Sequence, residues 1–195
     1  MSTETREYWE ERWQAGRTAW DRGAPSPALR HWLERDLIPP GRILVPGCGN
    51  GYEVEALAGA GFQVTALDIV PGPLESLRAR LAERGLEAEL VQDDVFTYGP
   101  AEPFDAVYEQ TCLCAFNPDA RPAYVRQLTR WVRPGGTLLA LFAQTPWRNG
   151  PPFHSPPEQM RALFTDDQWQ WPEQADLTVP HEAGFQELGY RLVRR

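Results

Sequence analysis

The sequence has little basic charge, few cysteines and no long apolar run, and each shortage narrows the class of protein. The 195-residue chain carries a net charge of −8, which disfavours nucleic acid or an anionic membrane as its main partner. No apolar run approaches the ~20 residues of a membrane span, and the polar segment 1–12 is not typical of a signal peptide. With 42% hydrophobic residues at this length, we expect one globular domain with a full core.

Cysteine and histidine are too scarce for a disulfide framework or a zinc site. The three cysteines, Cys48, Cys112 and Cys114, are odd in number, and without a secretory signal they favour a reducing compartment, the cytoplasm. The three histidines are isolated from one another in the sequence, so we expect no bound metal. We interpret Cys112 and Cys114 as small packing residues, with a reactive thiol as the alternative.

The segment 43–51, Ile-Leu-Val-Pro-Gly-Cys-Gly-Asn-Gly, is the most informative in the chain. Its apolar residues predict a buried strand, and its alternate glycines predict a turn whose backbone lies against a ligand, because a Cβ would block close approach and disfavour positive φ. A second apolar run ends at Asp68, whose carboxylate can accept two hydrogen bonds from a ribose diol. This order predicts a nucleotide-binding βαβ unit; the alternative is a tight turn in an α/β core.

The glycine spacing argues against a dinucleotide. The dinucleotide fingerprint is Gly-x-Gly-x-x-Gly, whereas this chain has Gly-x-Gly-x-Gly over 47–51. Glu53 and Glu55 place negative charge in the first turn of the following helix, which disfavours a phosphate there, and no lysine follows the glycines as in a P-loop. A cofactor with a ribose and no phosphate fits better, and we interpret it as S-adenosylmethionine. A nicotinamide-dependent oxidoreductase remains the alternative.

Apolar periodicity predicts strands that alternate with helices, which is typical of a parallel sheet covered on both faces. The predicted strands are 42–46, 63–68, 88–92, 105–108 and 137–142. The predicted helices are 4–15, a helix capped by Ser26, 52–60, 73–84, 118–132 and 157–164. Two more strands are predicted within 169–179 and 186–193, with no readable register.

Trp9, Trp13 and Trp20 all lie in the first twenty residues, well before the first predicted strand of the sheet. Trp9 and Trp13 are four residues apart and share one face of a helix. They could pack on the core, or they could form a lid over a cationic ligand, since aromatic faces attract cations by roughly 0.5–2 kcal/mol. A sulfonium is such a cation, and both interpretations stay open.

Four segments in order resemble the thiopurine S-methyltransferase family in its broad sense, which includes bacterial thiopurine methyltransferases and plant methyl halide and thiol methyltransferases. The segments are 9–20, 44–51 with 67–69, 93–96 with 104–105, and 108–121 with 134–136 and 150–152. The resemblance implies a single-domain, Rossmann-like class I S-adenosylmethionine-dependent methyltransferase over 1–195. It implies an α/β fold with a mostly parallel seven-stranded sheet, helices on both faces, a helical lid over 1–40 and a core over 41–195.

The resemblance also implies roles for individual residues. The implied cofactor-binding residues are Trp9, Trp13, Trp20, Gly47, Gly49, Asp68, Asp94, Val95 and Gln110. The tryptophans would close over the cofactor, Gly47 would contact it through its backbone, and Asp68 would hold the ribose hydroxyls. Asp94 and Val95 would lie beside the adenine, with Asp94 accepting from the exocyclic amine. Gln110 would lie near the methyl donor.

One segment departs from the thiopurine enzymes: they have Asp-Arg-Gly where this chain has Glu109, Gln110 and Thr111. Glutamine offers a neutral amide in place of a guanidinium, and the plant halide enzymes look closer here. The expected acceptor is therefore a small soft nucleophile: a thiol, a halide or a chalcogen oxyanion, with thiopurine also possible. Glu109 and Gln110 are the candidate catalytic residues, although Glu109 could equally be a strand-end acid bonded locally.

We expect the partner to be this small-molecule acceptor, with neither nucleic acid nor a membrane. The sequence does not fix the oligomeric state, for which a monomer is the default expectation. A non-catalytic module that binds S-adenosylmethionine remains an alternative, because the change at Gln110 removes the family's usual side chain at that position.

Overall fold

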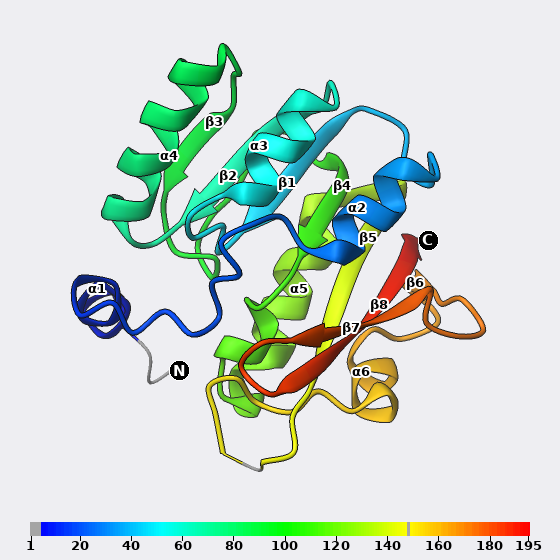
Figure 1. The fold of residues 1–195 in the computed structure, drawn as a ribbon. Coiled ribbons are helices and arrows are strands. Elements are labelled where there is room, and N and C mark those ends of the chain that lie inside the picture. Colours follow the sequence, from blue (N-terminus) through cyan, green and yellow to red (C-terminus); the bar gives the residue numbers. More distant parts are fainter. Residues whose placement is uncertain (1–4, 148) are drawn as a thin grey trace. The chain divides into compact units, whose positions relative to one another are not determined.

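The computed structural model describes residues 5–147 and 149–195, and Figure 1 shows the course of the chain. The chain divides into two compact parts, residues 5–98 and residues 99–195. In these described ranges no helix combines the length and the apolar character needed to cross a membrane.

The first part is built on three parallel strands in the order β3-β2-β1. They are β1 (Arg42–Pro46), β2 (Gln63–Asp68) and β3 (Glu89–Gln92). Their register pairs Ile43 with Val64 and Ala66 with Leu90. The apolar runs of β1 and β2 are buried, which confirms their interpretation as core strands.

Four helices belong to this part: α1 (Arg6–Gln14), α2 (Pro27–Glu34), α3 (Tyr52–Gly59) and α4 (Pro71–Arg84). Right-handed crossovers from β1 to β2 and from β2 to β3 place α3 and α4 on the same face of the strands, as Figure 1 shows. Ser26 caps α2 through a 3.2 Å hydrogen bond that its hydroxyl accepts from Ala28 N, and Gly85 ends α4 at φ 64°. Both of these predicted helix boundaries are confirmed.

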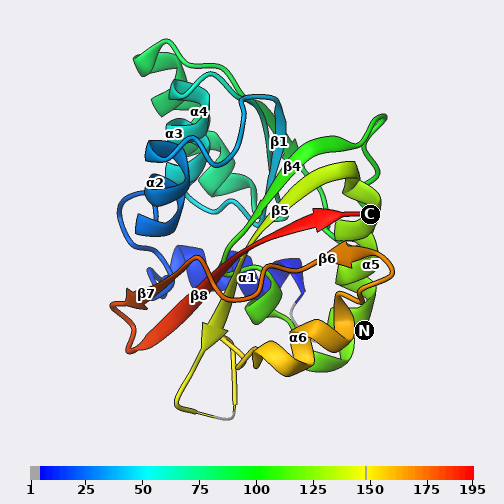
Figure 2. The same ribbon diagram turned by 90° about the vertical axis from the view of Figure 1, so that its right-hand side faces the viewer.

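The second part is organised around the long strands β5 (Val132–Gln144) and β8 (Phe185–Arg194), which run antiparallel side by side (Figure 2). The other strands are β4 (Phe104–Glu109), parallel to β5, and β6 (Trp169–Gln170) and β7 (Leu177–His181), both antiparallel to β8. The helices are η1 (Leu113–Ala115), η2 (Pro118–Ala120), α5 (Arg121–Trp131) and α6 (Pro157–Leu163).

The α/β class is confirmed, but three predicted details differ. The described residues form eight strands rather than seven, because the segment 169–179 divides into β6 and β7. The pairings of β8 make the strand arrangement mixed rather than mostly parallel. Strand β5 begins at Val132 rather than at the predicted residue 137, with an irregularity near its start, since Phe104 pairs with Val132 while Ala106 pairs with Thr137.

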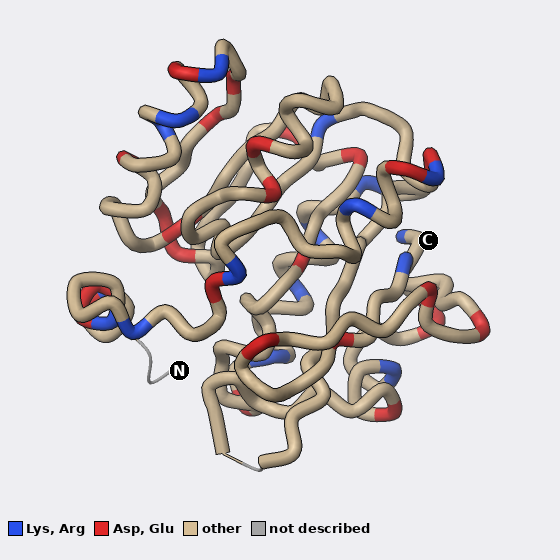
Figure 3. The backbone as a smooth tube through the Cα atoms, viewed as in Figure 1, with Lys and Arg blue, Asp and Glu red and all other residues tan. Residues whose placement is uncertain are grey.

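Charged residues of both signs are interleaved along α4, as Figure 3 shows. Most acids of the first part lie at the surface, but Glu55 on α3 is only 5% exposed. A buried carboxylate needs a compensating partner, and two arginines of α4 supply it, as described below.

Candidate active site

The glycine turn between β1 and α3 adopts the left-handed backbone that only glycine enters freely. Gly47, Gly49 and Gly51 have φ of 59°, 51° and 70°, so each position disfavours an L side chain. A Cβ on Gly51 would also crowd Leu77 of α4, which makes this glycine a packing requirement. Gly47, by contrast, is exposed, and its backbone is accessible to a ligand.

Asp68 fastens the end of β2 to this turn. Its Oδ2 accepts a 2.8 Å hydrogen bond from Gly49 N and its Oδ1 a 2.9 Å bond from Val70 N. Burial raises the pKa of Asp68, and the backbone N–H groups oppose that rise. The sequence predicts Asp68 as a ribose ligand; the structure adds that the same carboxylate shapes the turn.

The three N-terminal tryptophans gather into one cluster. Trp20 lies edge-to-face against Trp9 and Trp13, with ring centroids 5.5 Å and 5.8 Å apart. A Cβ built on Gly49 would lie 3.3 Å from Trp13 Cζ2, so the indole covers the glycine turn. Within α1, all of which the structure describes, no residue is buried. This helix therefore adds little to the core, which favours the lid interpretation over the packing one.

Asp94 and Val95 lie in the turn after β3, next to Asp68. Asp93 N donates to the carbonyl oxygen of Asp68 at 3.2 Å, which ties this turn to the end of β2. Asp94 Oδ1 accepts from Phe96 N at 2.9 Å, and Val95 is 8% exposed. The structure thus brings the predicted residues at the ends of β1, β2 and β3 together.

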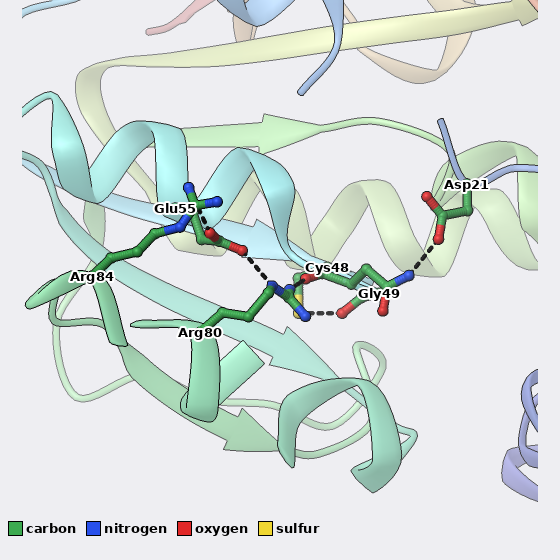
Figure 4. Close-up of polar contacts among 7 residues, drawn as sticks. Asp21, Cys48, Gly49, Glu55, Arg80 and Arg84 are labelled. Carbon is green, nitrogen blue, oxygen red and sulfur yellow. Dashed lines mark hydrogen bonds and ion pairs between the residues drawn. The ribbon is translucent and has the colours of Figure 1, made fainter. Parts of the chain in front are cut away.

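The acids that open α3 have internal partners. Glu53 Oε1 accepts from Ser26 N at 2.9 Å. Glu55 pairs with Arg80 Nε at 2.7 Å and with Arg84 Nη1 at 3.0 Å (Figure 4). The charge of Glu55 is therefore compensated by two arginines, and this residue repels an anion at the turn less than the sequence pattern indicates. The sequence offers no local signal for these pairs, because the partners lie 25 or more residues apart.

The second part of the chain holds the remaining predicted residues, at the end of β4. Gln110 Oε1 accepts from Tyr108 Oη at 2.7 Å, and Gln110 Nε2 donates to Glu187 Oε2 at 3.0 Å. These two bonds fix which way the amide of Gln110 points. Glu187, fully buried on β8, was not identified by sequence reasoning, because it lies 77 residues away from Gln110.

Glu109 is buried and holds the loop that follows it. Its Oε1 accepts from Leu113 N at 2.6 Å, and its Oε2 has no hydrogen-bond partner among the described residues. Burial raises the pKa of Glu109 to about 7; the bond from Leu113 opposes the rise and the nearby Glu187 adds to it. The geometry is that of a strand-end acid bonded locally, which was the structural alternative for this residue.

Thr111, beside Gln110, has an unusual backbone. Its φ of 57° lies in the left-handed region, which costs a β-branched residue roughly 1–3 kcal/mol. Its Oγ1 donates to the carbonyl oxygen of Gln110 at 2.8 Å. Such strain is typical of segments held for function.

Arg121, at the start of α5, organises the loop that follows β5. It is 1% exposed, and its Nη1 and Nη2 donate to the carbonyl oxygens of His154 and Phe153 at 3.0 Å and 3.1 Å. Trp147 packs on a buried cluster that contains Cys114, and all three cysteines are buried. Cys112 and Cys114 are therefore packing residues, as predicted, and Arg121 is a structural residue whose role the sequence did not reveal.

Known methyltransferases are similar to this chain in fold and in sequence. A crystal structure of Burkholderia thailandensis 1,6-didemethyltoxoflavin-N1-methyltransferase, with 1,6-didemethyltoxoflavin and S-adenosylhomocysteine bound, matches with a TM-score of 0.76 and 23% identity, covering 97% of this chain and 86% of that one. A probable thiol methyltransferase 2 of Arabidopsis thaliana is 37% identical over 154 residues, 78% of this chain and 68% of the relative. A thiopurine S-methyltransferase of Pseudomonas putida is 28% identical over 187 residues, 85% and 84% of the two chains.

The fold matches Rossmann-like methyltransferases of known structure, and together with the methyltransferase relatives it defines a class I S-adenosylmethionine-dependent methyltransferase. The family model for thiopurine S-methyltransferase matches residues 4–194, and the chain belongs to that family. The resemblance inferred from the sequence motifs is thereby confirmed.

Proposed function

We propose that this protein transfers a methyl group from S-adenosylmethionine to a small soft nucleophile: a thiol, a halide or a chalcogen oxyanion. The observation that carries the proposal is that two side chains lie at Gly49 of the glycine turn. The carboxylate of Asp68 accepts from the Gly49 backbone N–H, and the indole of Trp13 lies over this glycine. A carboxylate suits a ribose diol, and an aromatic face suits a sulfonium.

The described residues fit this cofactor. Each oxygen of the Asp68 carboxylate accepts one backbone N–H and keeps a lone pair for a hydroxyl group. Gly47 offers exposed backbone, and we propose that Asp94 and Val95 hold the adenine from the neighbouring turn. Trp9, Trp13 and Trp20 are half-buried, and we propose that they close over the cofactor as a lid.

The reaction asks for alignment more than for acid–base chemistry. S-adenosylmethionine supplies a methyl group that its sulfonium already activates. The residues of this chain would orient the reactants, and orientation alone can contribute ~7–11 kcal/mol. A thiolate or a halide needs no proton removed, so the burial of Glu109 is compatible with activity.

We propose that Gln110 faces the acceptor and that Glu109 acts as a positioning residue for the loop that carries it. Tyr108 and Glu187 hold the Gln110 amide, which leaves one amide proton for a ligand. A neutral amide contributes less than a guanidinium to binding an anion, so we expect thiols among the best acceptors. The names of the relatives, thiol, thiocyanate and thiopurine methyltransferases, support this range.

We further propose a cytoplasmic enzyme that works without nucleic acid or a membrane. Among the described residues none of the three cysteines forms a disulfide, which supports a reducing compartment. The net charge of −8 supports a small-molecule partner over a polyanion.

Calorimetric titration with S-adenosylhomocysteine and with NADH tests the cofactor. We expect S-adenosylhomocysteine to bind with micromolar affinity and NADH not to bind. A panel of thiols, iodide, thiocyanate and selenite with labelled methyl donor then tests the acceptor. Binding without turnover on any acceptor would favour the non-catalytic module, and preference for NADH would favour the oxidoreductase.

Replacing Trp13 with alanine tests the lid. Because Trp13 is half-buried and covers Gly49, we expect the affinity for S-adenosylmethionine, whose sulfonium is a cation, to fall about tenfold, within the range of cation–π energies. The melting temperature should change little, since α1 adds no buried residue to the core. Calorimetry measures the affinity and thermal unfolding the stability; a folded variant with unchanged affinity would refute the lid.

A further inference from the structure

A chain of polar contacts links the segment after α1 to the glycine turn and then to helices α4 and α3, as Figure 4 shows. Asn50, within the turn, donates from Nδ2 to Asp21 Oδ2. The carbonyl oxygen of Asn50 accepts from Arg80 Nη2, and Arg80 Nε pairs with Glu55 Oε1 at 2.7 Å. We call Asp21, Asn50, Arg80 and Glu55 the clasp.

The two ends of the clasp differ in burial and in secondary structure. Glu55 is 5% exposed and its partner Arg80 lies on α4, with 28% of its side chain exposed, so this end is anchored between two helices. Asp21 lies in the irregular segment after α1, directly beside Trp20. Its Oδ1 accepts from Gly23 N at 2.8 Å, which fixes the carboxylate within its own segment and aims Oδ2 at Asn50.

The segment 5–25, which we call the lid segment, therefore contacts the glycine turn at two successive residues of that turn. Trp13 lies over Gly49, and Asp21 binds Asn50. Trp20, next to Asp21, packs against both Trp9 and Trp13. Asp21 therefore adjoins, in sequence, the tryptophan whose ring contacts both of the others.

Tyr52, the first residue of α3, lies close to Arg80 of the clasp. Arg80 Cζ is 5.6 Å from its ring centroid. Burial is the main reason that the pKa of Tyr52 is raised, and the nearby Asp21 carboxylate contributes to the rise. The Asp21 carboxylate is thus seated in the clasp rather than pointing only to solvent.

We propose that Asp21 is a positioning residue that latches the tryptophan lid to the glycine turn through Asn50, so that cofactor residence time depends on this one contact. The proposal rests on the proposed function for its ligand. Arg80, paired with Glu55, binds the backbone carbonyl of Asn50 and so connects the turn to α4. Asp21 binds the side chain of Asn50 and so connects the turn to the lid segment. The latch acts on cofactor release and not on methyl transfer itself.

Asn50→Asp sets two carboxylates against each other, and the swap Asp21→Asn with Asn50→Asp restores the hydrogen bond with its direction reversed. We expect Asn50→Asp to raise the dissociation rate of S-adenosylhomocysteine about tenfold. The KM for the methyl donor should rise in step, with kcat nearly unchanged. The swap should recover most of the loss; because it keeps aspartate at position 50, recovery cannot come from a direct contact with the cofactor.

Glu11→Gln is the matched control, since Glu11 is an exposed acid of the lid segment, paired with Arg17 at 2.9 Å. It should leave the dissociation rate unchanged. A swap that fails to recover, or an Asn50→Asp variant with wild-type dissociation, overturns the latch.

Hydrogen exchange of the ligand-free proteins separates the latch from the proposed function. Amides of residues 5–25 should exchange faster in Asn50→Asp than in the wild type and return in the swap. Unchanged exchange overturns the latch even if the cofactor binds. A wild-type protein that fails to bind S-adenosylhomocysteine, with exchange behaving as expected, overturns the proposed function alone.

Discussion

Replacing Asp68 with alanine is expected to weaken binding of S-adenosylhomocysteine at least about 100-fold, or ~3 kcal/mol. The carboxylate is 7% exposed and accepts from Gly49 N and Val70 N. Hydrogen bonds to a charged group contribute roughly 1.5–3 kcal/mol each. Alanine would remove the ribose acceptor and also leave two backbone donors near the turn without their partner.

A purely structural effect can be separated from loss of the ribose contact. An analogue of S-adenosylhomocysteine without the 2′-hydroxyl should bind the wild type about tenfold more weakly than the parent compound. The alanine variant, checked for folding by circular dichroism, should not distinguish the two ligands. If the wild type binds both ligands equally, the 2′-hydroxyl makes no contact that contributes to affinity, and the proposed role of Asp68 toward it is wrong.

Glu109→Gln is expected to stabilise the protein, increasingly so as the pH rises. The pKa of Glu109 is raised from 4.5 to about 7 by burial, so folding favours its protonated form. Between these two values the unfolded chain releases the proton while the folded chain keeps it, and stability falls; above about pH 7 the loss is complete, at roughly 3 kcal/mol. Glutamine is a neutral analogue of the protonated acid and can still accept from Leu113 N. The stability of the variant therefore does not fall as the pH rises through this range.

Urea unfolding at pH 5.5 and 8.5 measures this effect. The advantage of Glu109→Gln over the wild type should widen by about 2 kcal/mol between these pH values. Methyl transfer to a thiol should be retained, because Glu109 acts through the loop and not on the acceptor. A pH-independent difference would show that folding does not shift the pKa, and a folded but inactive variant would restore Glu109 as a catalytic base.

The local part of this molecule was predictable from sequence. The bounds predicted for β1 and β2, 42–46 and 63–68, agree with the structure, because apolar runs and glycine turns act within a few residues. The cap at Ser26 and the stop at Gly85 are equally local. The glycine turn and Asp68 were found for the same reason.

Features set by distant pairing were not predictable. The C-terminal strands take their register from β8, which pairs with β5 from Thr137↔Val193 to Gln144↔Gln186, and periodicity within 169–193 carries no trace of that choice. Glu187, which accepts from Gln110, and Arg80, which pairs with Glu55, lie on distant elements, so one sequence cannot name them. Positive φ at Thr111 was also invisible, since β-branched residues rarely enter that region.

The hydrogen bond between Gln110 and Glu187 has a consequence for the order in which the protein is made. Synthesis proceeds from the N-terminus, so all the residues proposed to hold the cofactor, other than Gln110, have been synthesised before β4 is complete. Glu187, which accepts from the Gln110 amide, lies 77 residues later, on the last strand to be translated. A nascent chain can therefore assemble the proposed cofactor site early, whereas the Gln110 amide, proposed to face the acceptor, gains its defined orientation only when β8 pairs with β5.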